Sequence, residues 1–373
     1  MGKAGAQAAV LDEPGRIADQ DPGGMFALLG RWPEQWEAAA SLARGARLPE
    51  ASAARRASGT GFRHVVVSGM GGSAIGGDLL RSYLADSMRV PLVVNRSYAC
   101  PAFVGPDTLF VAVSYSGGTE ETLAAVSAAL ERGAEVAGVT SGGRLENKCR
   151  RAGKAVFPVP GGLPPRQALG YLFLSVLGLL EGLGLAPDQA SAVEETGDLM
   201  SYLVRSYGSE VPTAENPAKI LAVSLHGRIP VIYGVQDRTD AVALRWRGQF
   251  HENSKNWAAS NALPELDHNE ITSWPALSGL TRKSVAVIFL EDAEDGARME
   301  RRREITRRLI APHVADVAGV RSRGRSRLAR LFSLVLLGDF VSAYLAVLNR
   351  VDPLPVPVIE DLKKALTENS PPE

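Results

Sequence analysis

Short, continuous apolar runs alternate with amphipathic stretches along most of the chain. In the first half, such runs occupy residues 64–68, 91–95, 108–114 and 135–141, and segments with helical spacing lie between them. Strands that are apolar on both faces are typical of parallel sheets covered by helices on each side. The pattern therefore predicts a doubly wound α/β layer.

The second half repeats this arrangement, because apolar runs at 229–235 and 283–292 are each followed by a helical pattern. The length of 373 residues also suggests two domains, at ~150 residues per domain. We therefore predict an α/β fold with two three-layer α/β/α sandwich domains of the flavodoxin-like, doubly wound kind. The predicted parts are a helical N-terminal arm, a first domain, a helical connector and a second domain with a C-terminal helix, at 1–55, 56–185, 186–225 and 226–373.

Two longer apolar stretches, 169–185 and 331–348, have some features of membrane spans. Glu181 interrupts the first and Asp339 the second, and both are shorter than the ~20 apolar residues that a span needs. We expect both to form buried core helices.

The charge of the chain is balanced, with 41 Lys and Arg against 41 Asp and Glu. This balance argues against a nucleic-acid binder, and the Arg-dense stretches at 298–308 and 321–330 fit salt-bridged helix faces better than an RNA surface. Two cysteines cannot build a disulfide framework, and the first residues lack the apolar region of a signal peptide. We expect a soluble, cytoplasmic protein that holds any anionic ligand by local geometry, without nucleic acid or membrane as a partner.

A glycine-rich loop, SGMGGSAIGGD at 68–78, follows the first apolar run. Glycines permit positive φ and close approach of a ligand, and free N–H groups at the next helix start attract phosphate. Residues 69–74 fit the dinucleotide pattern G-x-G-x-x-A, but the next strand ends in Asn95 and Arg96 instead of a ribose-binding acid. A phosphate loop is therefore favoured over an NAD(P) site, and a glycine turn that serves only packing is the alternative.

A second polar loop, SYSGGTEET at 114–122, also lies between a strand and a helix. The hydroxyls of Ser114, Ser116 and Thr119 surround two glycines at one helix N-terminus. Hydroxyls and backbone amides in this arrangement can saturate the oxygens of a phosphate without a cation. Helix capping would account for one of these hydroxyls but not for all three.

These two loops together resemble the sugar isomerase (SIS) domain, whose loops bind phosphosugars. The segments PPRQALGYLF at 164–173 and HENSKNWAASNALPELDHNEITSW at 251–274 more narrowly resemble the bifunctional phosphoglucose/phosphomannose isomerase family. The resemblance implies two SIS domains and a homodimer. It also implies an enzyme that interconverts glucose 6-phosphate and fructose 6-phosphate, with mannose 6-phosphate as a second aldose substrate. The reaction is expected to need neither metal nor cofactor.

The resemblance assigns roles to individual residues. Isomerisation through a cis-enediol needs a base that moves a proton between C1 and C2, a ring-opening group and positive charge near the enediolate oxygens. Glu252 matches the base and Arg166 matches the arginine that stabilises the enediolate. His268 matches the ring-opening residue, which reaches the site of the neighbouring subunit. Lys363 matches the lysine that joins His268, with the adjacent Lys364 as the alternative.

The same resemblance implies which residues bind the substrate. The phosphate is expected to bind Ser114, Ser116 and Thr119. The sugar is expected to lie near Gly71, Gly72 and Ser73. The chain departs from the family pattern at Gly118 and His251, where asparagine is usual. Leu354 and Val356 stand near the place where members active on mannose 6-phosphate carry a threonine, which favours the glucose half of the activity.

Three other interpretations are open. His251, Glu252, His268 and Glu270 offer ligands for zinc, but no His-x-x-x-His or Cys pair fixes them on one element. A regulator that binds phosphosugars without converting them would need the two loops but not the four catalytic candidates. An isomerase of another sugar phosphate would share every motif, because the sequence does not reveal the stereochemistry tolerated at C2.

Overall fold

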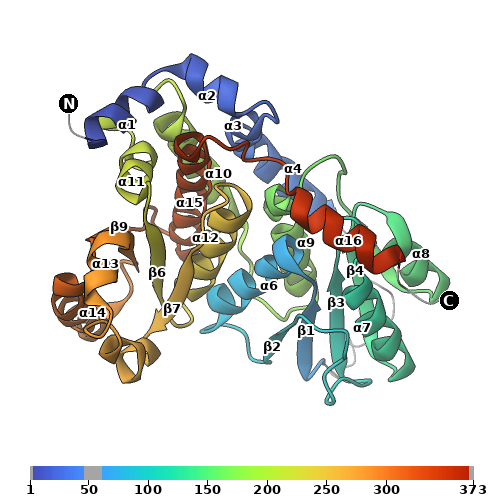
Figure 1. Ribbon diagram of the computed structural model, residues 1–373. Helices are drawn as coiled ribbons and strands as arrows, with labels where there is room; N and C mark the ends of the chain where they lie inside the picture. Colours follow the sequence, from blue (N-terminus) through green and yellow to red (C-terminus); the bar gives the residue numbers. More distant parts are fainter. Residues whose placement is uncertain (1–2, 46–60, 369–373) are drawn as a thin grey trace.

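Two parallel β-sheets lie side by side in the computed structural model, which describes residues 3–45 and 61–368 (Figure 1). The first sheet has the order β2-β1-β3-β4-β5 and the second the order β7-β6-β8-β9, and every neighbouring pair of strands is parallel. The prediction of two doubly wound α/β domains is therefore confirmed. The predicted junction between arm and first domain falls within residues 46–60, outside the described part of the chain.

The elements follow one another as strand and helix through both domains. The strands are β1 (His64–Ser68), β2 (Leu92–Asn95), β3 (Thr108–Val113), β4 (Glu135–Thr140), β5 (Ala155–Pro158), β6 (Ile229–Val235), β7 (Ala259–Leu263), β8 (Val285–Glu291) and β9 (Asp316–Arg321). The helices are α1 (Lys3–Leu11), α2 (Pro14–Gln20), α3 (Met25–Gly30), α4 (Trp32–Gly45), α6 (Gly71–Leu84), α7 (Glu120–Glu131), α8 (Gly143–Arg151), α9 (Leu169–Gly182), α10 (Ala190–Tyr207), α11 (Pro217–Leu225), α12 (Asp240–Glu252), α13 (Ser278–Ser284), α14 (Gly296–Ile310), α15 (Arg327–Asn349) and α16 (Pro357–Glu368).

The apolar runs predict the edge strand β2 but not β5, β7 and β9, which also lie at the edges of their sheets. Most of their residues are only half-buried or exposed. A strand that is covered on fewer sides needs no continuous apolar run, so the pattern that marks the central strands is missing.

Helix α15 forms the centre of the core between the two sheets. It is long and apolar enough to cross a membrane, but its apolar window is entirely buried within the fold. The ring of Phe332 on this helix packs against Trp36 of α4, with 4.6 Å between ring centroids, and against Phe173 of α9, at 4.9 Å. Both apolar stretches are thus core helices, as predicted, and the N-terminal arm contributes to the same core.

Gly338 of α15 lies where Trp246 of α12 crosses the helix. A Cβ at this position would overlap the Trp246 indole, whose Nε1 donates a hydrogen bond to the Leu334 carbonyl (2.8 Å). Alanine normally stabilises a helix interior by up to ~1 kcal/mol relative to glycine. In Gly338→Ala, we instead expect the free energy of unfolding to fall by about 1–3 kcal/mol, the usual cost of overpacking, as measured by urea denaturation.

The matched control for this prediction is Gly279→Ala in the exposed helix α13, where a Cβ would meet nothing within 4 Å. This variant should keep or slightly raise the stability. Equal stability of the Gly338 and Gly279 variants would contradict the prediction.

Candidate active site

The first glycine loop lies at the carboxyl end of β1, between β1 and β3. The chain order reverses at this point of the first sheet, and such a switch point forms a crevice in which ligands bind. A Cβ on Gly69 would lie 2.7 Å from the Val113 carbonyl oxygen, and one on Gly72 would lie 2.7 Å from the Arg166 nitrogen. Gly71 has a φ of 50°. The glycines are therefore needed both for the turn and for close packing against neighbouring loops.

The hydroxyl-rich loop lies beside it, at the carboxyl end of β3. The two loops are joined because the Tyr115 N–H donates to Oγ of the buried Ser73 (3.2 Å). Oγ of Ser114 and Oγ1 of Thr119 are 2.8 Å apart, and the Gly118 N–H donates to Oγ of Ser116 (3.3 Å). The three predicted hydroxyls therefore lie together at the start of α7.

Capping does not account for these hydroxyls. Thr119 is the N-cap residue of α7, but among the described residues its side chain makes no capping hydrogen bond with that helix. Because the first N–H groups of a helix have no partner within it, the start of α7 remains suited to an anion.

Arg166 is the buried cation of the site. It lies in a short 3₁₀ helix, Pro165–Gln167, and is only 3% exposed. Its Nε donates to Oδ1 of Asn253 (2.7 Å). Its Nη2 donates to the carbonyls of Pro353 (3.0 Å) and Leu354 (2.7 Å). The remaining nitrogen, Nη1, lies 3.4 Å from Oε2 of Glu252. The guanidinium is thus fixed by neutral acceptors and presents one edge to the predicted base.

Glu252 is the last residue of α12 and is partly open to solvent, with 28% of its side chain exposed. Burial lowers the pKa of Arg166, and the Glu252 carboxylate opposes this effect. The structure therefore brings together the predicted base and the predicted enediolate-stabilising arginine, which are 86 residues apart in the sequence.

A second layer of polar side chains supports this pair. Arg245 of α12 forms an ion pair with Asp339 of α15 (2.7 Å), and both side chains are at most 2% exposed. Asp339 also accepts a hydrogen bond from Nε2 of Gln249 (2.7 Å), and Nη2 of Arg245 donates to the Arg166 carbonyl (3.1 Å). Burial raises the pKa of Asp339, and the charge of Arg245 opposes this shift.

The space in front of Arg166 and Glu252 is a cavity of about 160 Å³, lined also by the glycines Gly71 and Gly72. Two further cations also line it, Arg96 and Arg247, which no motif in the sequence marks as site residues. Arg96 forms an ion pair with Asp78, and burial, followed by the charge of Arg247, lowers its pKa. In the described part of the chain, the Arg247 side chain has no hydrogen-bond or ion-pair partner.

Helical spacing offers a signal for part of this lining. Arg245, Gly248, Gln249 and Glu252 recur at intervals of three and four residues and form one face of α12. Arg96 follows β2, at the place where a dinucleotide-binding protein would carry a ribose-binding acid. This residue is itself part of the site.

The structure does not bring His268 and Lys363 into this cavity. His268 is exposed at the end of a 3₁₀ helix, Glu265–His268, that follows β7. Lys363 is exposed on α16. A single chain, within its described residues, thus unites Glu252, Arg166 and the glycine loop in one cavity, while the hydroxyl-rich loop is hydrogen-bonded to the glycine loop beside it and the predicted ring-opening pair lies elsewhere.

The four side chains considered as zinc ligands do not form one cluster, and two of them are hydrogen-bonded to other groups. Glu270 accepts hydrogen bonds from the Tyr233 hydroxyl and from Nδ2 of Asn261. Nε2 of His251 accepts from the Ala258 N–H (3.1 Å). Among the described residues, no group of three or more His, Cys, Asp and Glu side chains is placed to hold a metal ion.

Comparison with known proteins connects this site with a family. Residues 214–366 match the model of the bacterial phospho-glucose isomerase C-terminal SIS domain. A bifunctional phosphoglucose/phosphomannose isomerase from Caldicellulosiruptor bescii is 45% identical over 307 residues, which cover 82% of this chain and 89% of the relative. A protein of the same description from Thermoplasma acidophilum is 37% identical, over 82% of this chain and 90% of the relative.

Among solved structures, a hypothetical protein from Thermus thermophilus has a TM-score of 0.69 at 19% identity and covers 98% of this chain and 93% of its own. This similarity supports the two-domain fold alone. The sequence relatives are more informative, because their higher identity extends over 82% of this chain and about nine-tenths of each relative. The chain belongs to the bifunctional phosphoglucose/phosphomannose isomerase family.

Proposed function

We propose that this protein is an aldose–ketose isomerase that interconverts glucose 6-phosphate and fructose 6-phosphate, and mannose 6-phosphate and fructose 6-phosphate. The observation that carries the proposal is the placement of Glu252 beside the buried guanidinium of Arg166, in a cavity bordered by the glycine loop. Relatives with this pair of activities in their names support the choice of substrates.

In the proposed reaction, the Glu252 carboxylate takes the proton from C2 of the open-chain aldose and returns it to C1. The electron pair of the broken C–H bond forms the C1–C2 double bond of a cis-enediolate, whose negative charge lies on O1. A proton then passes from O2 to O1 as the ketone forms at C2. Arg166 faces this charge with a guanidinium that is already held by three hydrogen bonds, so little reorganisation is needed in the transition state.

The phosphate is proposed to bind at the start of α7, on Ser114, Ser116 and Thr119. These hydroxyls lie with the free amides of the helix at one end of the crevice. The sugar then lies along Gly71, Gly72 and Ser73 towards Glu252. Arg247 adds a cation that forms no ion pair with a carboxylate of the described residues.

Ring opening is proposed to need a second copy of the chain, in a cytoplasmic homodimer. His268 is exposed and does not line the cavity of its own chain, which suits a residue that acts in the partner's site. Helix α16, which carries Lys363, also exposes the apolar side chains of Val358 (79%), Leu362 (59%) and Leu366 (49%). A dimer would remove apolar surface of this kind from water.

Replacement of the base tests the catalytic assignment. In Glu252→Gln, we expect kcat to fall by at least ~10²-fold while the affinity for fructose 6-phosphate changes little, because the amide keeps the shape but cannot accept the proton. Steady-state kinetics and calorimetric binding measure the two quantities separately. Glu304→Gln on α14, at an exposed position (68%), is the control and should keep full turnover. Near-normal turnover of Glu252→Gln would refute the role of Glu252.

Co-expression of two inactive variants tests the shared site. If His268 acts across a two-fold interface, a mixed dimer of Glu252→Gln and His268→Ala chains contains one intact site. Random pairing should then restore about a quarter of the wild-type activity. Co-expression of Glu252→Gln with Glu252→Ala gives the baseline, since no pairing of those chains restores a base. Recovery no greater than this baseline would show that His268 does not serve the neighbouring site.

Chelation tests the substrates and the metal independence together. The purified protein is incubated with fructose 6-phosphate and EDTA, and the hexose phosphates are separated by chromatography. We expect both glucose 6-phosphate and mannose 6-phosphate at unchanged rates. A single product would narrow the substrate range, loss of rate with EDTA would refute metal independence, and no product would favour a phosphosugar-binding regulator.

A further inference from the structure

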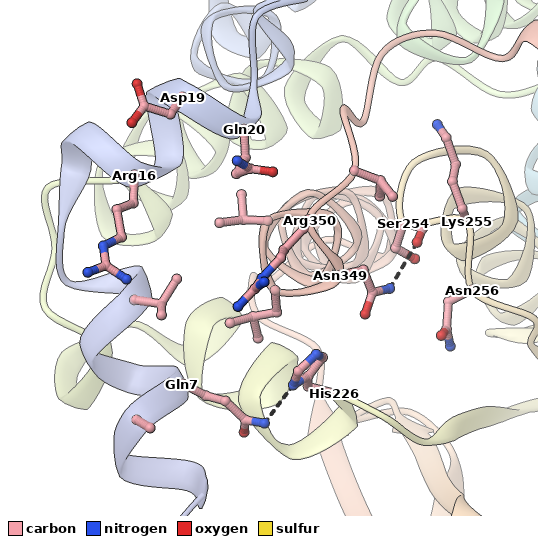
Figure 2. Close-up of a pocket in the computed structure, with 15 residues that line it drawn as sticks. Gln7, Arg16, Asp19, Gln20, His226, Ser254, Lys255, Asn256, Asn349 and Arg350 are labelled. Carbon is pink, nitrogen blue, oxygen red and sulfur yellow. Dashed lines mark hydrogen bonds between the residues drawn. The ribbon is translucent and has the colours of Figure 1, made fainter.

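A second and larger cavity lies at the carboxyl ends of α12 and α15 and shares no lining residue with the cavity of the candidate active site. Its volume is about 990 Å³, near the upper end of the range for small-molecule sites. It is open to solvent on one side and is lined by α1 and α2 of the arm, by the end of α11, by the loop after α12 and by the end of α15 (Figure 2). Nothing in the proposed isomerase reaction uses this space.

Positive charge predominates in the cavity. Three cations, Arg16, Lys255 and Arg350, and one carboxylate, Asp19, line it, and Asp19 points away from the Arg350 side chain in Figure 2. Arg16 forms an ion pair with Glu13 and is half exposed, so part of its charge is already compensated. Lys255 donates to the carbonyls of Glu252 (2.5 Å) and Pro355 (2.8 Å), which are neutral acceptors.

Arg350 is the most distinctive of these residues. It ends α15 in the left-handed conformation, with a φ of 58°, and its side chain extends into the cavity towards His226 (Figure 2). Within the described residues, its guanidinium has no hydrogen-bond or ion-pair partner. A guanidinium with a free planar edge is suited to bind phosphate or carboxylate through two parallel hydrogen bonds.

Neutral polar groups complete the lining around Arg350. The amide of Gln7 is hydrogen-bonded to Nδ1 of His226 (2.5 Å), and the amides of Gln20 and Asn256 also face the cavity. Val347 and Leu348 add apolar surface beside them. A ligand that combines a small carbon skeleton with a charged phosphate would match this combination.

The walls of this cavity are continuous with the segments that build the active site. Ser254 and Lys255 directly follow Glu252 and Asn253, and Val351 lies two residues before Pro353. Nδ2 of Asn349 donates to the Ser254 carbonyl (2.9 Å) and thereby ties the two walls together (Figure 2).

The residues that accept hydrogen bonds from Arg166 therefore belong to the same segments as these walls. Asn253 and Pro353–Leu354 hold the guanidinium, and Lys255 links the end of α12 to Pro355 on the same C-terminal segment. A ligand that moves either wall changes the geometry of Glu252 against Arg166.

We propose that this cavity is a second binding site, which takes a small organic phosphate on Arg350 and changes the rate of isomerisation when it is occupied. The coupling rests on the proposed role of Glu252, whereas the binding does not. A direct binding measurement therefore separates a failure of this proposal from a failure of the proposed function.

The probe is phosphoenolpyruvate, titrated calorimetrically into the full-length protein. Arg350→Met removes the charge and should weaken binding by about tenfold or more, the usual consequence of losing a hydrogen bond to a charged group. Gln20→Glu places a carboxylate at the cavity without shortening the side chain and should have the same effect. Arg298→Met, at an exposed position on α14, is the matched control and should bind as the wild type does.

The competing outcome is binding in the catalytic cavity. If Arg247→Met weakens the binding of phosphoenolpyruvate while Arg350→Met and Gln20→Glu do not, the proposed site is wrong. Absence of any binding to the wild-type protein would overturn the proposal equally.

The coupling is tested by isomerase kinetics with saturating phosphoenolpyruvate. A coupled site should change kcat or KM about fivefold or more in the wild-type enzyme, and Arg350→Met should lose this response. Purely competitive inhibition that persists in Arg350→Met would place the ligand in the active site and refute the coupling.

Discussion

The buried ion pair between Arg245 and Asp339 is the interaction on which the arrangement of the site depends. Asp339 interrupts the long apolar helix at the centre of the core, and its carboxylate is completely buried. Loss of one partner of such a pair typically costs about 3–5 kcal/mol, because the other charge is left without compensation. The pair also positions the site, because Arg245 donates a hydrogen bond to the Arg166 carbonyl. It fixes α12 against α15 and, through α12, fixes Glu252 against Arg166.

The second sheet repeats the order of the first four strands of the first sheet, which has a fifth strand, but the two domains divide the proposed chemistry. In the first, glycines and hydroxyls follow β1 and β3 and leave the carboxyl edge of the sheet open to a phosphate. In the second, the end of β8 carries Glu291 and Asp292, which pair with Arg307 and Arg330. These carboxylates border a cavity of about 290 Å³ but are already neutralised by arginines, and the second domain contributes to the proposed site through the far end of α12 instead. The proposed catalytic carboxylate and the proposed phosphate site therefore come from different domains.

Much of the fold follows from the sequence, because central parallel strands must be apolar on both faces. The edge strands β5, β7 and β9 leave no such pattern. The two loops can also be predicted from the sequence, because their glycines and hydroxyls shape the backbone of the same short segment. The pairing of Glu252 with Arg166 becomes predictable only through resemblance, as it depends on how the domains meet. Arg96 and Arg247 escape prediction for the same reason: nothing local distinguishes them from surface arginines.

Local electrostatics explain how a chain of zero net charge can handle a doubly charged substrate. In the proposed reaction, negative charge leaves Glu252 when it takes the proton and reappears on the enediolate oxygen. Arg166, 3.4 Å from the Glu252 carboxylate, faces negative charge before and after the transfer. The buried guanidinium therefore always has a negative charge beside it. The free energy needed to desolvate Arg166 is spent when the protein folds and not during the reaction. The reaction then only moves charge over a short distance within a fixed field, which is the condition for electrostatic preorganisation.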